Sequence, residues 1–277
     1  RDIAEVPRFI EAPRRHGPLQ LGARGRLGRS LQARGYDQAI VLPNTWKSAL
    51  VPFFADIPLR SGYVGESRYG LLNLLYRAPP GKGRPDMRLF YARLSEAPGA
   101  EPRQPLPEPR LRIAVDEISR VREKFGLSQP YVVLCPGAEY GPAKRWPYFA
   151  ELAARLDEPA VLLGSANDRD AAQGVGGTDL VGRTTLDEAI ALIAGARAVV
   201  SNDSGLVHVA AALGRPQVAL YGSSSPLHTP PANAAARVLW LHVDCSPCYQ
   251  RECPLGHFKC MREMSAEMVF SELKAAR

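Results

Sequence analysis

Short apolar segments alternate with amphipathic helical segments through the second half of the chain, and this alternation limits the folds open to it. We predict strands at residues 131–134, 160–163, 179–182, 198–201, 217–222 and 237–243, and helices at 113–125, 148–156, 168–173, 186–194 and 206–213. Parallel strands need long crossover connections, which are usually helices. The pattern therefore predicts an α/β fold with helices on both faces of a parallel sheet, which binds ligands at the carboxyl ends of its strands.

The segment SNDSGLVHVAAAL, at residues 201–213, is the point where one predicted strand turns into a helix. The first N–H groups of a helix have no partner within it and its dipole is positive there, so phosphate is favoured beside Ser204 and Gly205. Asp203 can cap the helix or contact a ligand hydroxyl, and His208 lies on the same helical face as Ser204. Asp-Ser-Gly at a strand end is also typical of a helix that is merely capped, so the surroundings must decide.

Two further loops are expected at the same edge of the sheet. CPGAEYGPAKRW follows the first strand of this half and contains two glycines with Lys144 and Arg145, and GSANDRD follows the next strand with Asp168 near a helix start. Glycines, cations and a helix N-terminus together suit a diphosphate. The fingerprints GxGxxG and GxxxxGK[ST] are absent in their usual form, which argues against a dinucleotide dehydrogenase or an NTPase.

The first half of the chain is less regular. We predict a helix near residues 27–34, a strand at 39–42, and a helix at 44–54 that is capped by Asn44 or Thr45 and carries Lys47 in an early turn. Arg68 lies in a glycine-flanked loop, where it either contacts a polar substrate or is simply exposed. Residues 97–110 hold five prolines in fourteen positions and predict a linker.

Positive charge is concentrated in the first half. Residues 1–110 contain 18 Lys and Arg against 10 Asp and Glu, whereas the remainder contains 17 against 18. Such an excess fits an anionic partner such as nucleic acid, phospholipid headgroups or a phosphorylated substrate, and it equally fits a solvated, arginine-rich surface.

Four segments in order closely resemble the bacterial ADP-heptose:lipopolysaccharide heptosyltransferases of type II, in glycosyltransferase family 9. They are AIVLPNTWKSALVPFFADIPLRSGY, CPGAEYGPAKRWP, SNDSGLVHVAAALGRPQVALYGSSSP and CSPCYQRECPLGHFKCM. The resemblance implies two Rossmann-like domains of the glycosyltransferase-B type. We expect an acceptor-binding domain with a linker at 1–110, an ADP-heptose-binding domain at 111–264 and a C-terminal helix at 265–277.

The resemblance also assigns roles to residues at matching positions. The donor set it implies is Lys144, Asp203, Ser204, Gly205, His208, Thr184 and Asp168. In this family the lysine contacts the donor phosphates and the Ser-Gly pair lies at the diphosphate. The aspartate of the SNDSG motif holds heptose hydroxyls, and the positions of Thr184 and Asp168 surround the adenosine. For the acceptor we expect Asn44, Lys47 and Arg68.

A fixed cation and helix N–H groups stabilise the charge on departing ADP without a metal, so we expect no cofactor to be required for catalysis.

The family's presumed general base is an aspartate in a glycine-rich loop after the first strand of the N-terminal domain, and no residue here matches it. Asp37, Asp56 and Glu66 lie in different sequence contexts. We therefore expect the N-terminal domain to lack its first strand-loop-helix unit, and we leave the catalytic base unassigned. Such a chain should bind ADP or ADP-heptose but transfer heptose poorly on its own.

Four cysteines, Cys245, Cys248, Cys253 and Cys260, lie within sixteen residues, with His257 among them. Four thiols can form a tetrahedral structural zinc site, although only the first spacing is typical of one. The alternatives are reduced, partly buried cysteines or thiols that oxidise on storage. The separate Cys135 ends a predicted strand, and we expect it to serve packing.

The sequence therefore predicts an inverting transferase that moves L-glycero-D-manno-heptose from ADP-heptose to the first heptose of the lipopolysaccharide inner core. The partners would be ADP-heptose, the acceptor heptosyl-Kdo2-lipid A and the cytoplasmic face of the inner membrane, with no nucleic acid and a cytoplasmic location. One alternative is a basic, zinc-containing nucleic-acid-binding module. The other is a nucleotide-sugar-binding protein without transferase activity.

Overall fold

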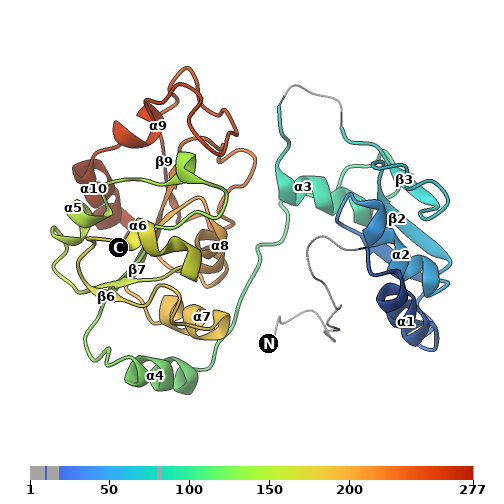
Figure 1. The fold of residues 1–277 in the computed structure, drawn as a ribbon, viewed down its shortest axis with the longest axis horizontal. Helices are drawn as coiled ribbons and strands as arrows, with labels where there is room; N and C mark the ends of the chain where they lie inside the picture. Colours follow the sequence, from blue (N-terminus) through green and yellow to red (C-terminus); the bar gives the residue numbers. More distant parts are fainter. Residues whose placement is uncertain (1–9, 11–18, 80–82, 277) are drawn as a thin grey trace. The chain divides into compact units, whose positions relative to one another are not determined.

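The computed structural model describes residues 10, 19–79 and 83–276 and divides the chain into two compact units. Among the described residues, those up to Pro107 form the smaller unit and those from Glu108 onward form the larger (Figure 1). In the region of the predicted linker, residues 97–110 contain neither helix nor strand, as their prolines predict. None of the described helices is both long and apolar enough to cross a membrane.

The smaller unit contains a parallel sheet in the order β1-β2-β3. Its elements are α1 (Leu21–Gln32), β1 (Gln38–Val41), α2 (Trp46–Phe54), β2 (Leu59–Tyr63), β3 (Leu74–Tyr76), α3 (Met87–Ala92) and the 3-10 helix η1 (Arg93–Ser95). The prediction found β1 and α2 but missed β2 and β3, since the glycines around them are typical of loops. Helix α1 begins six residues earlier than predicted, within the run LGARGRLG.

Two small apolar clusters hold this unit together. In one, the rings of Tyr63 and Phe90 are stacked with their centroids 3.8 Å apart, and the Tyr63 hydroxyl donates a hydrogen bond to the Phe90 carbonyl. The other joins Val41 of β1, Ala49 of α2 and Leu72. Both clusters pack helices or loops against the short sheet.

Helix α1 packs against α2 at a position where only glycine fits. A Cβ atom at Gly28 would lie 2.5 Å from Cβ of Phe54 and 2.9 Å from the carbonyl oxygen of Val51. Real Cβ atoms essentially never approach so closely, so this glycine permits the contact between the two helices.

The larger unit contains six parallel strands in the order β6-β5-β4-β7-β8-β9. The strands are β4 (Val132–Cys135), β5 (Ala160–Leu162), β6 (Thr178–Asp179), β7 (Ala198–Asn202), β8 (Gln217–Tyr221) and β9 (Arg237–Trp240). The helices are α4 (Val115–Lys124), α5 (Phe149–Ala153), α6 (Arg169–Ala172), α7 (Leu186–Ala194), α8 (Gly205–Ala212), α9 (Lys259–Arg262) and α10 (Ala266–Ala276), with 3-10 helices η2 (Pro142–Lys144) and η3 (Ala166–Asp168). The alternating pattern thus predicted this sheet correctly, although α5 and β6 are shorter than expected.

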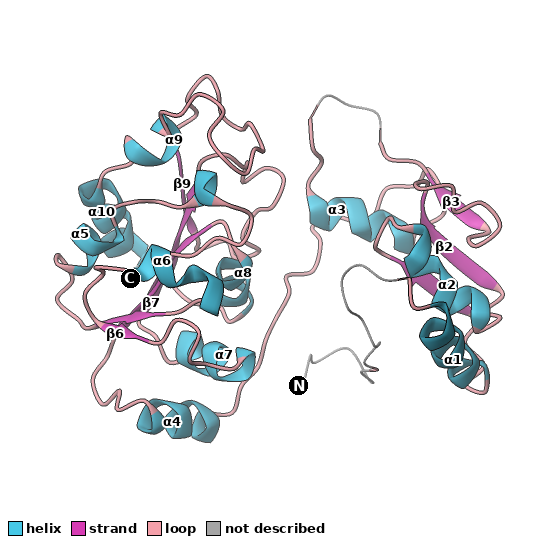
Figure 2. Cartoon of the chain, viewed as in Figure 1, coloured by secondary structure: helices cyan, strands magenta, loops and turns pink. Residues whose placement is uncertain are grey.

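Successive strand residues face opposite sides of this sheet, and each side has its own core. Val132 and Leu134 belong to the cluster beneath α5 and α10, whereas Val133 belongs to the cluster beneath α4, α7 and α8. Figure 2 shows the strands with helices on either side. The C-terminal helix α10 contributes Val269 and Leu273 to the first cluster, and both are fully buried.

Substitution of Gly28 by alanine should destabilise the smaller unit, because the added methyl group forces α1 away from α2. We expect a loss of about 1–3 kcal/mol in the free energy of unfolding, the range for overpacked sites. The matched control is Gly22→Ala in the same helix, where the new Cβ meets only the Arg26 side chain at 3.6 Å. Denaturant unfolding of the two variants measures the difference, and equal stabilities would contradict the close contact.

Candidate active site

Three loops meet at the carboxyl edge of the larger sheet, as predicted. Strand β4 lies between β5 and β7, so the segments that follow these three strands are neighbours. The side chain of Asn202, at the end of β7, joins two of them. Its amide nitrogen donates to the Pro136 carbonyl at 2.8 Å, and its oxygen accepts from the Trp146 N–H at 3.1 Å. Asn202 is fully buried. That it joins these loops was not predicted from the sequence, because roles were assigned only to the Asp-Ser-Gly part of the SNDSG motif.

The loop that follows β5 is held by Asp168, one of the residues predicted near adenosine. Its Oδ2 accepts hydrogen bonds from the backbone N–H of Ser165 at 2.9 Å and from the Ser165 hydroxyl at 2.7 Å. A Cβ atom at Gly137 would lie 2.1 Å from the Asp168 carboxyl carbon. Gly137 therefore brings the first loop against this carboxylate.

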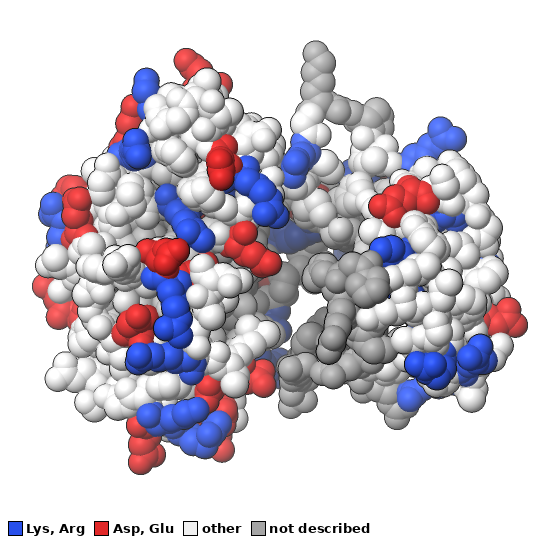
Figure 3. Space-filling model, viewed as in Figure 1, with Lys and Arg blue, Asp and Glu red and all other residues white. Residues whose placement is uncertain are grey.

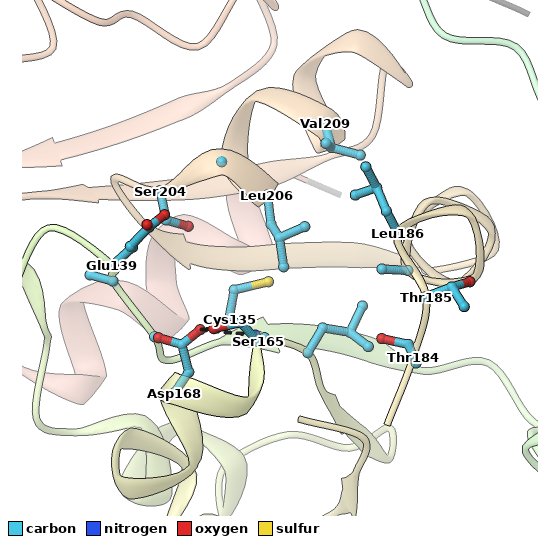
Figure 4. A pocket seen from close by; sticks show the side chains of 16 residues that line it. Cys135, Glu139, Ser165, Asp168, Thr184, Thr185, Leu186, Ser204, Leu206 and Val209 are labelled. Atoms are coloured by element: carbon cyan, nitrogen blue, oxygen red, sulfur yellow. Dashed lines mark hydrogen bonds between the residues drawn. The ribbon is translucent and has the colours of Figure 1, made fainter. Parts of the chain in front are cut away.

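These loops enclose a pocket of about 390 Å³. Leu186 at the start of α7 and Leu206 and Val209 on α8 form apolar walls, with Glu139 and Ser204 toward one end (Figure 4). The predicted residues Thr184 and Asp168 also line the pocket. An apolar pocket with polar groups at its ends suits a nucleoside, whose base is flat and apolar on its faces.

Cys135 lies in the wall of this pocket at the end of β4, with a side chain that is 2% exposed. Burial raises the pKa of Cys135 to about 12, so its thiol is protonated at neutral pH. It packs with Val133 and Val161 in one of the two cores, as predicted.

A second pocket, of about 380 Å³, shares Glu139, Ser204 and Gly205 with the first. Two pockets with common wall residues can hold two parts of one ligand. The predicted donor residues that line only this second pocket are Lys144, Asp203 and His208. All seven residues of the predicted donor set thus lie in the walls of these adjoining pockets.

The carboxylate of Asp203 is surrounded by polar partners. Its Oδ2 accepts from Lys144 Nζ at 2.5 Å and from the Ser224 hydroxyl at 2.5 Å, while Oδ1 lies 3.4 Å from the Thr229 hydroxyl. The side chains of Lys144 and Asp203 are 16% and 5% exposed. Sequence reasoning had assigned these two residues to separate parts of a ligand, whereas here they form an ion pair.

The start of α8 is open. Its N-cap is Ser204, whose side chain makes no capping hydrogen bond. The Asp203 carboxylate is bonded to Lys144 and Ser224 instead. A Cβ atom at Gly205 would meet no protein atom within 4 Å. The first N–H groups of α8 therefore face space that both pockets share.

Four residues of the second pocket were not singled out from the sequence: Glu139, Tyr140, Thr229 and Arg251. Glu139 and Tyr140 lie in the CPGAEYG motif, for which the prediction considered only the glycines and the cations that follow. Arg251 lies between Cys248 and Cys253, so its place beside the donor loop follows only from the fold.

The three residues predicted to bind an acceptor lie in the smaller unit. Arg68 is only 1% exposed and donates to the Pro43 carbonyl at 2.6 Å, to Asn44 Oδ1 at 3.3 Å and to the Tyr63 carbonyl. Burial lowers the pKa of Arg68. This burial contradicts the alternative that Arg68 is simply exposed, since its guanidinium holds loops together, whereas its predicted contact with an acceptor stays a prediction. Lys47 lies in the first turn of α2.

The four clustered cysteines are free thiols that line one small cavity of about 20 Å³ together with His257. Burial and the neighbouring thiols raise the pKa of Cys260 to about 11. For Cys253 burial acts in the same upward direction, but hydrogen bonds from backbone N–H groups, including that of Phe258 at 3.4 Å, lower its pKa. In the described part of the chain, no three His, Cys, Asp or Glu side chains are arranged to hold a metal ion.

Comparison with known proteins gives consistent results. Residues 24–259 match glycosyltransferase family 9 (heptosyltransferase). The chain is 44% identical to lipopolysaccharide heptosyltransferase 2 of Escherichia coli K12 over 99% of its own length and 84% of that protein. It is 42% identical to lipooligosaccharide heptosyltransferase 2 of Haemophilus influenzae Rd, over 86% of its length and 75% of that protein.

Among solved structures, the chain matches E. coli ADP-heptose lipopolysaccharide heptosyltransferase II with a TM-score of 0.81 and 42% identity. The match covers 94% of this chain and 82% of the other. This likeness, with the two parallel sheets, confirms the predicted α/β class of the glycosyltransferase-B type. The comparisons do not support the nucleic-acid-binding module or the binding protein without transferase activity. The chain is an enzyme of glycosyltransferase family 9, the heptosyltransferases.

Proposed function

We propose that this heptosyltransferase moves L-glycero-D-manno-heptose from ADP-heptose to the first heptose of the lipopolysaccharide inner core, with inversion at the anomeric carbon. The observation that carries the proposal is the pair of adjoining pockets that share the open start of α8. A nucleoside fits the first, a sugar fits the second, and the diphosphate between them faces the N–H groups beside Ser204 and Gly205. The names of the relatives supply the donor and the acceptor class.

Charge explains how these residues would promote the reaction. As the acceptor hydroxyl attacks the anomeric carbon, the bond from that carbon to the diphosphate oxygen breaks and negative charge grows on ADP. The start of α8 and the Lys144 ammonium group stabilise this charge in place. Lys144 is paired with Asp203, so the donor phosphates would compete for the lysine and release the carboxylate toward heptose hydroxyls.

The remaining donor roles follow from the pocket walls. Asp168 and Thr184 line the first pocket, which we call the nucleoside pocket. His208 lies one turn after Ser204 in the second pocket, which we call the sugar pocket. An acceptor role for Asn44, Lys47 and Arg68 stays a proposal, in which Arg68 would act by holding Asn44 in place. The general base is unassigned.

A contact with the inner membrane on its cytoplasmic face is also proposed, because the acceptor is anchored in lipid. Helix α1 exposes Arg26 and Arg29 and carries no acidic residue. Figure 3 shows basic side chains gathered toward the α1 end of the smaller unit. Such a surface attracts anionic headgroups.

The reaction itself can be tested with purified chain, ADP-heptose and heptosyl-Kdo2-lipid A. We expect the acceptor to gain the mass of one heptose while ADP is released, as measured by mass spectrometry and nucleotide analysis, and we expect this transfer to be slow because no residue of this chain is assigned as the general base. An acceptor that lacks the first heptose is the control. Release of ADP without any gain in acceptor mass would contradict the proposed acceptor.

Replacing Gly205 by alanine should weaken ADP binding by about tenfold or more, because the methyl group would enter the space where the phosphates approach α8. The protein should remain folded, since the new Cβ meets no protein atom within 4 Å. Calorimetric titration with ADP measures the effect. Gly176→Ala, which also points into open space but lines neither pocket, is the matched control, and equal ADP affinities in the two variants would argue against a ligand at α8.

Zinc at the cysteine cluster also remains a proposal, supported by four thiols around one cavity and by the N–H groups that favour a thiolate at Cys253. The thiols would have to move closer together to bind the ion. Metal analysis of protein purified without added zinc should find about one zinc per chain and much less in a Cys253→Ser variant. Absence of metal from the unaltered protein would favour reduced, packed cysteines.

A further inference from the structure

Arg251 brings a second cation to the sugar pocket from a distant part of the sequence. It lies in the segment between Cys248 and Cys253, and it lines the pocket together with Lys144, Tyr140 and Glu139. It does not line the nucleoside pocket. A cation in this position faces the part of a nucleotide sugar beyond the nucleoside.

The backbone around Arg251 is held firmly against the donor loop. The Ala143 N–H donates to the Arg251 carbonyl at 3.0 Å, and the Tyr140 hydroxyl donates to the Tyr249 carbonyl at 2.6 Å. A Cβ atom at Gly141 would lie 2.5 Å from the Arg251 carbonyl oxygen. The segment therefore approaches the loop as closely as a glycine permits, which fixes the place of the arginine relative to Lys144.

The ring of Tyr140 also positions both cations. The Lys144 ammonium nitrogen lies 5.1 Å from the ring centroid and the Arg251 guanidinium carbon 5.4 Å from it. Contacts of this kind orient a cation and leave its N–H donors available to another partner. The aromatic ring thus holds two positive groups beside one pocket.

The charges of the two cations are balanced differently. Lys144 forms an ion pair with Asp203. No ion pair joins Arg251 to an acid in the described part of the chain, although Glu139 lines the same pocket. A donor diphosphate carries two or more negative charges, so one lysine that already has a carboxylate partner compensates only part of them.

We propose that Arg251 is a donor-binding residue that contacts the distal phosphate of the nucleotide, the one that carries the sugar. This inference rests on the proposed function and adds a residue and a specificity to it. The planar guanidinium can donate two parallel hydrogen bonds to phosphate oxygens. Because Arg251 lines only the sugar pocket, it distinguishes a nucleoside diphosphate from a monophosphate or a nucleoside.

Calorimetric titrations of Arg251→Ala with ADP, AMP and adenosine test the proposal in the full chain. We expect ADP affinity to fall about tenfold to a hundredfold, the loss typical of a charge-assisted hydrogen bond, AMP affinity to fall less, and adenosine affinity to stay unchanged. Arg251→Lys should keep part of the ADP affinity, because it keeps the charge but not the paired donors.

Arg262→Ala is the matched control. Arg262 also lies over an aromatic ring, that of Phe258 at 5.3 Å, near the same cysteines, but it lines neither of the two pockets. Its ADP affinity should equal that of the unaltered protein.

The outcomes separate this inference from the proposed function. If the unaltered protein binds ADP and Arg251→Ala binds it equally well, the inference is overturned while the proposed function stands. An equal loss of adenosine and ADP affinity would also overturn it, since the arginine would then only support the loop. If the unaltered protein fails to bind ADP, the proposed function fails and the inference falls with it.

Discussion

The buried side chain of Asn202 makes the contact on which the site depends. An amide in an apolar core is costly unless its groups are bonded, and Asn202 satisfies both ends with the backbone of one loop, at Pro136 and Trp146. Because the bonds need one arrangement of that loop, the end of β7 determines where the loop lies. Lys144 belongs to the same loop. Its distance from Asp203 is therefore set by the hydrogen bonds of Asn202, the residue that precedes Asp203.

Once the loop is in place, electrostatics organises the rest of the pocket. Asp203 is nearly buried and would be unstable as an isolated charge, and it is stabilised by Lys144, Ser224 and Thr229. This ion pair holds the Lys144 ammonium group beside the pocket. Replacing the Asp203 carboxylate by a donor phosphate at the Lys144 ammonium group then requires little movement of the protein. This is the condition for preorganised charge stabilisation.

Most of the larger unit could be predicted from the sequence, as could the gathering of the proposed donor residues in adjoining pockets, whereas much of the smaller unit could not. The alternation of apolar and helical segments located the sheet because its central strands β4, β5, β7 and β8 are buried on both faces. The SNDSG motif located Ser204 because helix starts bind anions. Strands β2 and β3 were missed because glycines and short length hide them. The places of Arg251 and Glu139 were missed because they depend on contacts between distant segments. The burial of Arg68 was not foreseen because a polar residue in a glycine-flanked loop gives no sign of burial.

The common wall at Ser204 and Gly205 has a consequence for inhibitors. Two small molecules, one in each pocket, would both lie beside the first turn of α8, so a short linker could join them. The linked compound would gain affinity through the high effective concentration of its second half. Its linker could be neutral, provided that it accepts hydrogen bonds from the N–H groups at the start of the helix, and a neutral linker crosses membranes more readily than a diphosphate.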